Sequence, residues 1–351
     1  MNGIIQGRQT LSGSDLEALR ALEEVCNKND GIKLKLNWDL LISRQPGSTD
    51  DFLYFDDSGK LLGYIAIYCF GMPEAEISGM VHPSYRRNGI FSKLLAYAAL
   101  ECRKRSVKSL LFINDRNSLP GASFAKSTGA LFDHSEHRME LPGSMVPIDV
   151  KCPVELRKAA ASDIDMLTKL NSICFDMDED ESRTYMLEMV TGAGEVTKSA
   201  IQGTDRIGAG RGTAVQEATV LEAAVQEAAV QEAAMQEDVV QEAAGAALSA
   251  DEGRNNPLEI YVSVLGGKNI GMLRLNWEND DLMIYGFGIL PEFRGKGYGR
   301  ATLATAVNLS LSRKPAHVGL EVDCVNDTAL SLYKSCGFNT IATYDYYRLA
   351  I

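Results

Sequence analysis

The chain has 351 residues, 45% of them hydrophobic and 23% charged, and a formal net charge of −12. This is the composition of a globular protein long enough for two domains, and its acidic balance argues against nucleic acid as the main partner. No run approaches the roughly 20 apolar residues of a membrane span, and the N-terminus lacks a signal-peptide pattern. Seven scattered cysteines and four histidines predict a cytoplasmic protein with neither disulfides nor a metal site.

The first 141 residues alternate between helix and strand patterns. Apolar residues three apart predict a helix over 15–27, and an Asp-Asp-Ser-Gly turn joins two apolar strands at 52–55 and 61–70. The remaining predicted elements are a strand at 77–81, a helix at 91–105 and strands at 110–113 and 132–141. Prolines and a glycine between 142 and 153 mark a linker.

The same order returns between 154 and 351. A strand at 154–157 precedes a helix from a Ser162 cap to Cys174 and a second helix at 181–190. Further on, we expect strands at 258–265, 269–277, 283–290, 318–322 and 340–349, with helices after 297 and at 328–335. The predicted fold class is α/β (α+β, with a mixed sheet), built as two tandem domains at 1–141 and 154–351.

A low-complexity insertion interrupts the second domain at about 195–256. Its core repeats a pentad close to Ala-Val-Gln-Glu-Ala, so helix is the favoured local state. A spacing of five moves the apolar residue about 140° around a helix at each repeat, and no continuous apolar stripe forms. We therefore expect an acidic, partly helical, solvent-exposed insertion, with a partner-binding arm as the alternative. Its acidic residues are Glu217, Glu222, Glu227, Glu232, Glu237, Asp238 and Glu242.

A glycine-rich turn between a predicted strand and a predicted helix is the most informative motif. It reads Ile289, Leu290, Pro291, Glu292, Phe293, Arg294, Gly295, Lys296, Gly297, Tyr298, Gly299 and Arg300. The three alternate glycines let backbone approach a bulky anion, and the N-terminal end of the following helix faces that anion. A weaker version in the first domain runs from Val81 to Phe91, through Arg86, Arg87 and Gly89.

These motifs resemble those of the Gcn5-related N-acetyltransferase (GNAT) superfamily. The second copy has Arg-x-x-Gly-x-Gly at 294–299, then Asn326, then Leu-Tyr-x-x-x-Gly-Phe at 332–338. The resemblance implies tandem GNAT domains, the first with a degenerate motif. It also implies an acyltransferase that moves an acetyl group from acetyl-CoA directly to the amine of a small molecule or peptide.

The resemblance assigns the cofactor to the second copy. The N–H groups from Gly295 to Arg300 are expected to meet the pyrophosphate, with Arg294, Lys296 and Arg300 adding positive charge. The backbone of Ile289 and Leu290 is expected to pair with the pantetheine amides. Asn326 either reaches the cofactor or lies in a turn before a helix.

Tyr333 is the candidate general acid, because the family has a tyrosine here and a phenol can protonate a departing thiolate. The alternative is a core aromatic residue. Phe124 is taken as its counterpart in the first copy, and Phe91, in the place of Gly299, is expected to crowd the pocket of N–H groups. Together these differences predict that the first copy is catalytically weakened.

The general base is less well defined. Glu321 is the first choice, because it lies on a strand near the predicted cofactor site. The other candidates, each also readable as an ordinary strand-end or strand side chain, are Asp323, Asp280, Asp281, Tyr285 and Glu76.

Two rival hypotheses stay open. One is a non-catalytic acyl-CoA-binding sensor or scaffold, and Tyr333 is the residue that separates it from the enzyme hypothesis. The other is a composite site in which the first copy receives the acceptor.

Overall fold

The protein is described here by a computed structural model that covers residues 3–69, 73–143, 147–191, 225, 258–278 and 280–351. The chain divides into two compact units. Among the described residues, the first unit holds those up to Asp133, together with Val225 and Tyr344–Ile351. The second unit holds His134 to Thr343 apart from Val225. We describe each unit by itself.

The first unit begins with a strand that the sequence patterns did not reveal. Its elements in chain order are β1 (Gly3–Arg8), α1 (Gly13–Asp30), α2 (Trp38–Ile42), β2 (Asp51–Asp56), β3 (Leu61–Cys69), β4 (Glu74–Val81), a 3-10 turn (Pro83–Tyr85), α3 (Ile90–Lys104), β5 (Ser109–Asp115) and α4 (Leu119–Ser127). Ser12 and Asp15 form a capping box at the start of α1, and Gly31 ends that helix with a left-handed φ of 64°.

The second unit repeats this plan. It contains β6 (Leu131–Glu140) from His134 onward, β7 (Glu155–Lys158), a 3-10 turn (Ala161–Asp163), α5 (Ile164–Phe175), α6 (Glu179–Thr191), β8 (Leu258–Leu265), β9 (Lys268–Glu278), β10 (Asp281–Ile289), a 3-10 turn (Pro291–Phe293), α9 (Tyr298–Leu311), β11 (Val318–Asp323) and α10 (Asp327–Ser335). The last strand of the chain is β12 (Asn339–Ala350). In the 3-10 turn before α5 the side chain of Asp163 accepts from the Ala160 N–H at 2.8 Å, and the N-cap residue of α5 is Asp163 rather than the predicted Ser162, with no side-chain cap.

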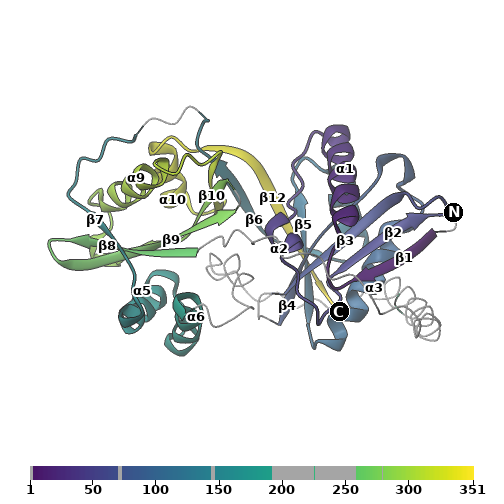
Figure 1. Ribbon diagram of the computed structural model, residues 1–351, viewed down its shortest axis with the longest axis horizontal. Coiled ribbons are helices and arrows are strands. Elements are labelled where there is room, and N and C mark those ends of the chain that lie inside the picture. The colour runs from purple at the N-terminus through teal and green to yellow at the C-terminus, as the bar shows by residue number, and fades with distance from the viewer. Residues whose placement is uncertain (1–2, 70–72, 144–146, 192–224, 226–257, 279) are drawn as a thin grey trace. The chain divides into compact units, whose positions relative to one another are not determined.

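The last strands of the two sequence copies are exchanged between the units (Figure 1). In the first unit the strand order is β1-β2-β3-β4-β5-β12, and β12 pairs antiparallel with β5 from Tyr344↔Asp115 to Ala350↔Ser109. In the second unit the order is β6-β11-β10-β9-β8-β7, and β6 pairs antiparallel with β11. Each sheet therefore contains one parallel pair, β4 with β5 or β10 with β11, as predicted for a mixed sheet.

Helices cover both faces of each sheet and bury an apolar core on each side. In the first unit α3 and α4 cover one face and α1 and α2 the other. In the second unit α9 and α10 cover one face, and α5 and α6 the other. The exchanged strands contribute to these cores: Leu349 of β12 packs in the first unit and Met139 of β6 in the second.

The structure confirms most predicted elements to within a few residues and adds β1, α2 and α4. The insertion at 195–256 lies outside the described residues except for Val225, which is buried against the core of the first unit. No helix in the described part of the chain is long and apolar enough to cross a membrane.

Candidate active site and cofactor cleft

In the second unit the two parallel strands separate midway along their length. Within the described residues, β10 and β11 pair from Leu282↔Val318 to Ile284↔Leu320 and no further. Both strands continue, β10 to Ile289 and β11 to Asp323. Backbone polar groups along such separating edges need partners, so the opening suits an extended ligand that carries amides.

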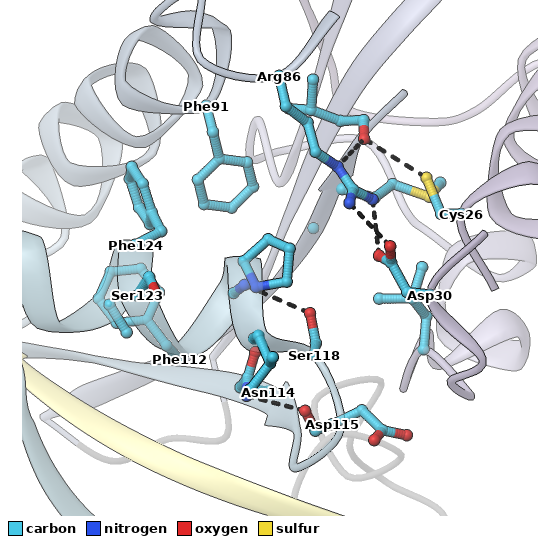
Figure 2. Close-up of a pocket in the computed structure, with 18 of the residues that line it drawn as sticks. Cys26, Asp30, Arg86, Phe91, Phe112, Asn114, Asp115, Ser118, Ser123 and Phe124 are labelled. Atoms are coloured by element: carbon cyan, nitrogen blue, oxygen red, sulfur yellow. Dashed lines mark hydrogen bonds and ion pairs between the residues drawn. The ribbon is translucent and has the colours of Figure 1, made fainter. Parts of the chain in front are cut away.

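The first unit has the same separation, and there it encloses a cavity of about 750 Å³ (Figure 2). Pairing of β4 with β5 ends at Ile77↔Phe112, although the strands run on to Val81 and Asp115. The cavity is lined by the separated strand segments, the end of α1 and the residues just after it, the turn before α3 with the start of that helix, and most of α4. The first copy therefore keeps an open cleft in spite of its degenerate motif.

The turns that follow the strands have the same backbone conformation in both units. In the second unit Gly295 and Gly297 have φ values of 73° and 81°, and α9 begins directly afterwards. In the first unit Arg87 and Gly89 take these places with φ values of 66° and 76° before α3. Each turn directs the N-terminus of a long helix toward the cleft, which is a favourable place for an anionic group.

The arginine of each motif fastens the turn to its strand. Arg294 Nε donates to the Ile289 carbonyl oxygen at 2.7 Å, and Arg86 Nε donates to that of Val81 at 3.1 Å. Arg86 also binds both carboxylate oxygens of Asp30, at 2.9 and 2.7 Å, and this hydrogen bonding lowers the pKa of Asp30. The guanidinium of Arg294 is thus committed in part to the protein backbone.

Cysteines lie beside both motif arginines, a correspondence that the sequence motifs did not suggest. Cys26 of α1 donates to the Val81 carbonyl at 3.6 Å, and Cys174 of α5 occupies the matching place near Arg294. Burial raises the pKa of each thiol to about 11. Both thiols therefore stay protonated near neutral pH and are poor nucleophiles.

The other cations of the glycine-rich turn contact backbone carbonyls. Lys296 Nζ donates to Glu292 at 2.8 Å, and Arg300 donates to Asp149 at 3.2 Å and to Ser335 at 3.4 Å. All three of these bonds are exposed, so a ligand can compete for them. The ring of Tyr298 packs beside Phe293, with centroids 6.3 Å apart.

A glycine and a phenylalanine have exchanged places between the two clefts. In the first unit a Cβ on Gly79 would come within 2.8 Å of the Phe91 ring. In the second unit a Cβ on Gly299 would lie 3.7 Å from the ring of Phe287, on the strand. The aromatic ring comes from the helix in one unit and from the strand in the other. Phe91, which is expected to crowd the pocket of N–H groups, lines the cavity of the first unit, and that cavity is open.

Tyr333 lies in the core of the second unit beside the cleft. Its side chain is buried, and its ring lies 6.4 Å from Phe287 and 6.2 Å from Phe338. Counted from the matching glycines Gly129 and Gly337 at the helix ends, Tyr333 corresponds to Ala125. The earlier match to Phe124 is wrong by one residue, but the first unit still has no phenol at this position.

Glu321 lies on β11 opposite Arg138 of β6, with an ion pair of 3.7 Å between Arg138 Nη1 and Glu321 Oε1. It is one residue beyond the last β10–β11 pair, where the cleft begins. Its counterpart in the first unit is Ile113, which follows Phe112 at the same point. Asp280 and Asp281 lie at the opposite end of β10, away from this opening.

Three further residues of the predicted site are placed by backbone contacts. Asn326 Oδ1 caps α10 by accepting from the Ala329 N–H at 3.1 Å, as its turn interpretation expects. The Leu290 N–H donates to the Ile270 carbonyl oxygen at 2.9 Å, toward β9. Of the two residues expected to pair with pantetheine, Leu290 thus has its N–H bonded to β9, and Ile289 has its carbonyl oxygen bonded to Arg294.

The sequence profile of the acetyltransferase (GNAT) family matches residues 17–126 and 223–338, one copy in each half of the chain. The chain belongs to the GNAT family. It is a tandem GNAT protein and an acyltransferase, as its motifs predicted. The family generally uses acetyl-CoA and acts on amine acceptors.

Solved structures agree on the fold. The chain is similar to a GCN5-related N-acetyltransferase from Sphaerobacter thermophilus, with a TM-score of 0.65, 15% identity and coverage of 99% of this chain and 95% of that one. It is also similar to a tandem GNAT protein from the clavulanic acid biosynthesis pathway, with a TM-score of 0.63, 14% identity and coverage of 99% and 98%. A GNAT-family acetyltransferase from Colwellia psychrerythraea has a TM-score of 0.52, 11% identity and coverage of 99% of both chains. No curated protein matches the chain significantly.

Proposed function

We propose that the second unit transfers an acetyl group from acetyl-CoA to the amine of a small molecule or peptide. The observation that carries this proposal is the position of Tyr333. Both units have a separated strand pair and a left-handed turn, but at the position on the last helix where the second unit has the phenol of Tyr333, the first has Ala125. Acetyl-CoA supplies the activated thioester.

The residues of the second unit suit such a ligand. Gly295 and Gly297 adopt left-handed φ values, and Gly299 leaves room between the helix start and the Phe287 ring. The N–H groups from Gly295 to Arg300 would bind the pyrophosphate, with Lys296 and Arg300 adding charge. Ile289 on the open edge of β10 would pair with the pantetheine arm.

Two proton transfers remain for the protein. Tyr333 donates its phenolic proton to the departing sulfur, because it lies beside the cleft on the face covered by α10. Glu321 accepts the proton of the acceptor amine, directly or through water, from the facing strand edge. Arg138 lies close enough to hold the Glu321 carboxylate in place.

The amino-acid composition supports a proposal for the charge of the acceptor and for the cellular compartment. Net charge of −12 favours a cationic acceptor over nucleic acid, and the scattered cysteines favour the cytoplasm. We further propose that the sequence copies run over 1–141 and 154–351 with a linker at 142–153, while the folded units exchange their last strands.

Gly297→Val provides the direct test of the cofactor site. A β-branched residue at a φ of 81° is strained by about 1–3 kcal/mol and puts a side chain at the start of α9. We expect calorimetric titration with CoA to lose one site per chain, and acetylation of an amine panel to stop. Gly267→Val is the matched control, because Gly267 has a φ of 78° in the β8–β9 turn of the same unit. Loss of binding in the control as well would contradict the assignment.

The cavity of the first unit favours a second candidate function. We propose that the first unit binds a CoA compound without turning it over. It has the cleft, the left-handed turn and the helix start, but Ala125 and Ile113 stand where the second unit has Tyr333 and Glu321. This is the non-catalytic acyl-CoA-binding hypothesis applied to one unit.

Ser123→Trp tests this second function. Ser123 is an exposed residue of α4 that lines the cavity, so an indole there is expected to fill the opening without disturbing the core. We expect the wild-type protein to bind two CoA molecules per chain and Ser123→Trp to bind one. Lys126→Trp, on the same helix but outside the cavity lining, should still bind two. A single site in the wild-type protein that survives Ser123→Trp would contradict the proposal.

A further inference from the structure

Strand β10 contains a β-bulge at the point where the cleft begins. Tyr285 lies opposite Arg274 of β9, and the next pair is Gly288 with Met272. Between these two pairs β10 therefore advances by three residues, whereas β9 advances by two. Gly286, at the bulge, has a φ of 50°. A bulge that begins with a left-handed glycine inserts one residue and reverses the alternation of the side chains that follow.

The bulge places Phe287 on the face that holds Tyr333. Before it, Leu282 and Ile284 pack in the core under α9 and α10, and Met283 and Tyr285 pack under α5 and α6. Unbroken alternation would send residue 287 to the α5–α6 face. Instead Phe287 packs in the α9–α10 core, with its ring 6.4 Å from that of Tyr333.

Arg274 lies against this bulge from the α5–α6 face. Its side chain is fully buried, and a Cβ on Gly286 would overlap its guanidinium atoms. The guanidinium also lies 5.2 Å from the centre of the Tyr185 ring and donates to the Tyr185 hydroxyl. Arg274 therefore contacts the bulge directly, and its place requires a glycine at 286.

The first unit has neither feature. There β3 and β4 pair without a shift, and the residue just past the last β4–β5 pair is Ser78, opposite Ala66. Ala66 therefore stands where the second unit has Arg274, and Gly79 follows Ser78 with no ring on the strand. The arginine and the bulge occur together in the unit that has Tyr333.

We propose that Arg274 is a positioning residue for acetyl transfer: with Tyr185, it holds the β10 bulge so that Phe287 packs against Tyr333. A buried guanidinium is expensive in stability, and an apolar residue of similar size often serves the fold as well. Its presence next to the bulge is therefore better explained by the geometry that it enforces. This inference rests on the proposed role of Tyr333 in the second unit.

The test combines kinetics with amide hydrogen exchange. Arg274→Met keeps an unbranched stem but removes the guanidinium, and Tyr185→Phe removes only the hydroxyl. We expect kcat to fall at least 10-fold in Arg274→Met and about threefold in Tyr185→Phe, while the midpoint of thermal unfolding changes by less than about 5 °C. Exchange in a peptide covering 282–290 should become faster in both variants. Lys268 is an exposed cation of the same strand as Arg274, and Lys268→Met is the control. This variant should change neither kcat nor the exchange rate of the 282–290 peptide.

A double variant separates positioning from general loss of structure. If Arg274 acts through Tyr333, the Arg274→Met change should cost little further kcat in a Tyr333→Phe background. The inference would be overturned if the kcat losses of the two single variants multiplied in the double variant. It would also be overturned if Tyr185→Phe kept the kcat and the exchange rate of the wild-type protein. An unchanged kcat in Tyr333→Phe alone would instead remove the proposed general acid, and faster exchange at 282–290 would still show whether Arg274 holds the bulge.

Discussion

Tyr333→Phe is expected to lower kcat by about 10- to 100-fold while the affinity for CoA changes little. The ring that packs between Phe287 and Phe338 is retained, so the core of the second unit should stay intact. The variant loses only the proton donor for the departing sulfur. Steady-state kinetics with an amine panel, together with calorimetry for CoA, separates these two effects.

The loss of kcat must be specific to the phenol of Tyr333. Tyr261→Phe is the control, because Tyr261 is another buried phenol of the same core, with its hydroxyl bonded to Glu259. Equal losses in the two variants would show that Tyr333 serves only as a core aromatic residue.

The motif turn and most elements of the fold could be predicted because local rules determine them. Alternating glycines at 295, 297 and 299 predicted a tight turn before a helix, and the structure shows left-handed φ values at the first two. Alternating and three-residue apolar patterns predicted most strands and helices. β1 could not be recognised as a strand, because its six residues, Gly3–Arg8, include two glycines and little apolar alternation.

The openness of the first cleft could not be predicted from its motif. The sequence shows a bulky Phe91 where the second copy has a glycine, and crowding was the natural inference. The compensating glycine is Gly79, on the strand and outside the motif, and only the folded structure brings the two together. The bulge at Gly286 was missed for a similar reason, since it depends on the pairing of β10 with β9.

The strand exchange could not be predicted either, because both exchanged strands satisfy the pattern of a final strand. β6 and β12 each follow a helix at the end of their sequence copy, so either could complete its own copy. The consequence is practical. A fragment that lacks residues 1–145 also lacks β6, the neighbour of β11 in the second unit. Such a deletion therefore cannot isolate an intact second unit as a test of a composite site.

A core substitution in an exchanged strand is expected to destabilise the unit in which the strand packs, rather than the unit formed by the rest of its sequence copy. Leu349 belongs to the second sequence copy but packs in the core of the first unit, whereas Met139 belongs to the first copy but packs in the second unit. Each is at least nine-tenths buried. Replacement of a buried leucine or methionine by alanine costs about 2–5 kcal/mol through lost contacts and the remaining cavity.

The two tryptophans of the chain allow the units to be followed separately. Trp38 packs in the first unit and Trp277 in the second. In a Trp277→Phe background, urea unfolding monitored by fluorescence should show the Trp38 transition moved to lower urea by Leu349→Ala but not by Met139→Ala. In a Trp38→Phe background the pattern should reverse. If Leu349→Ala instead shifted only the Trp277 transition and Met139→Ala only the Trp38 transition, each copy would keep its own last strand. Equal shifts of both transitions would mean that the two units unfold as one.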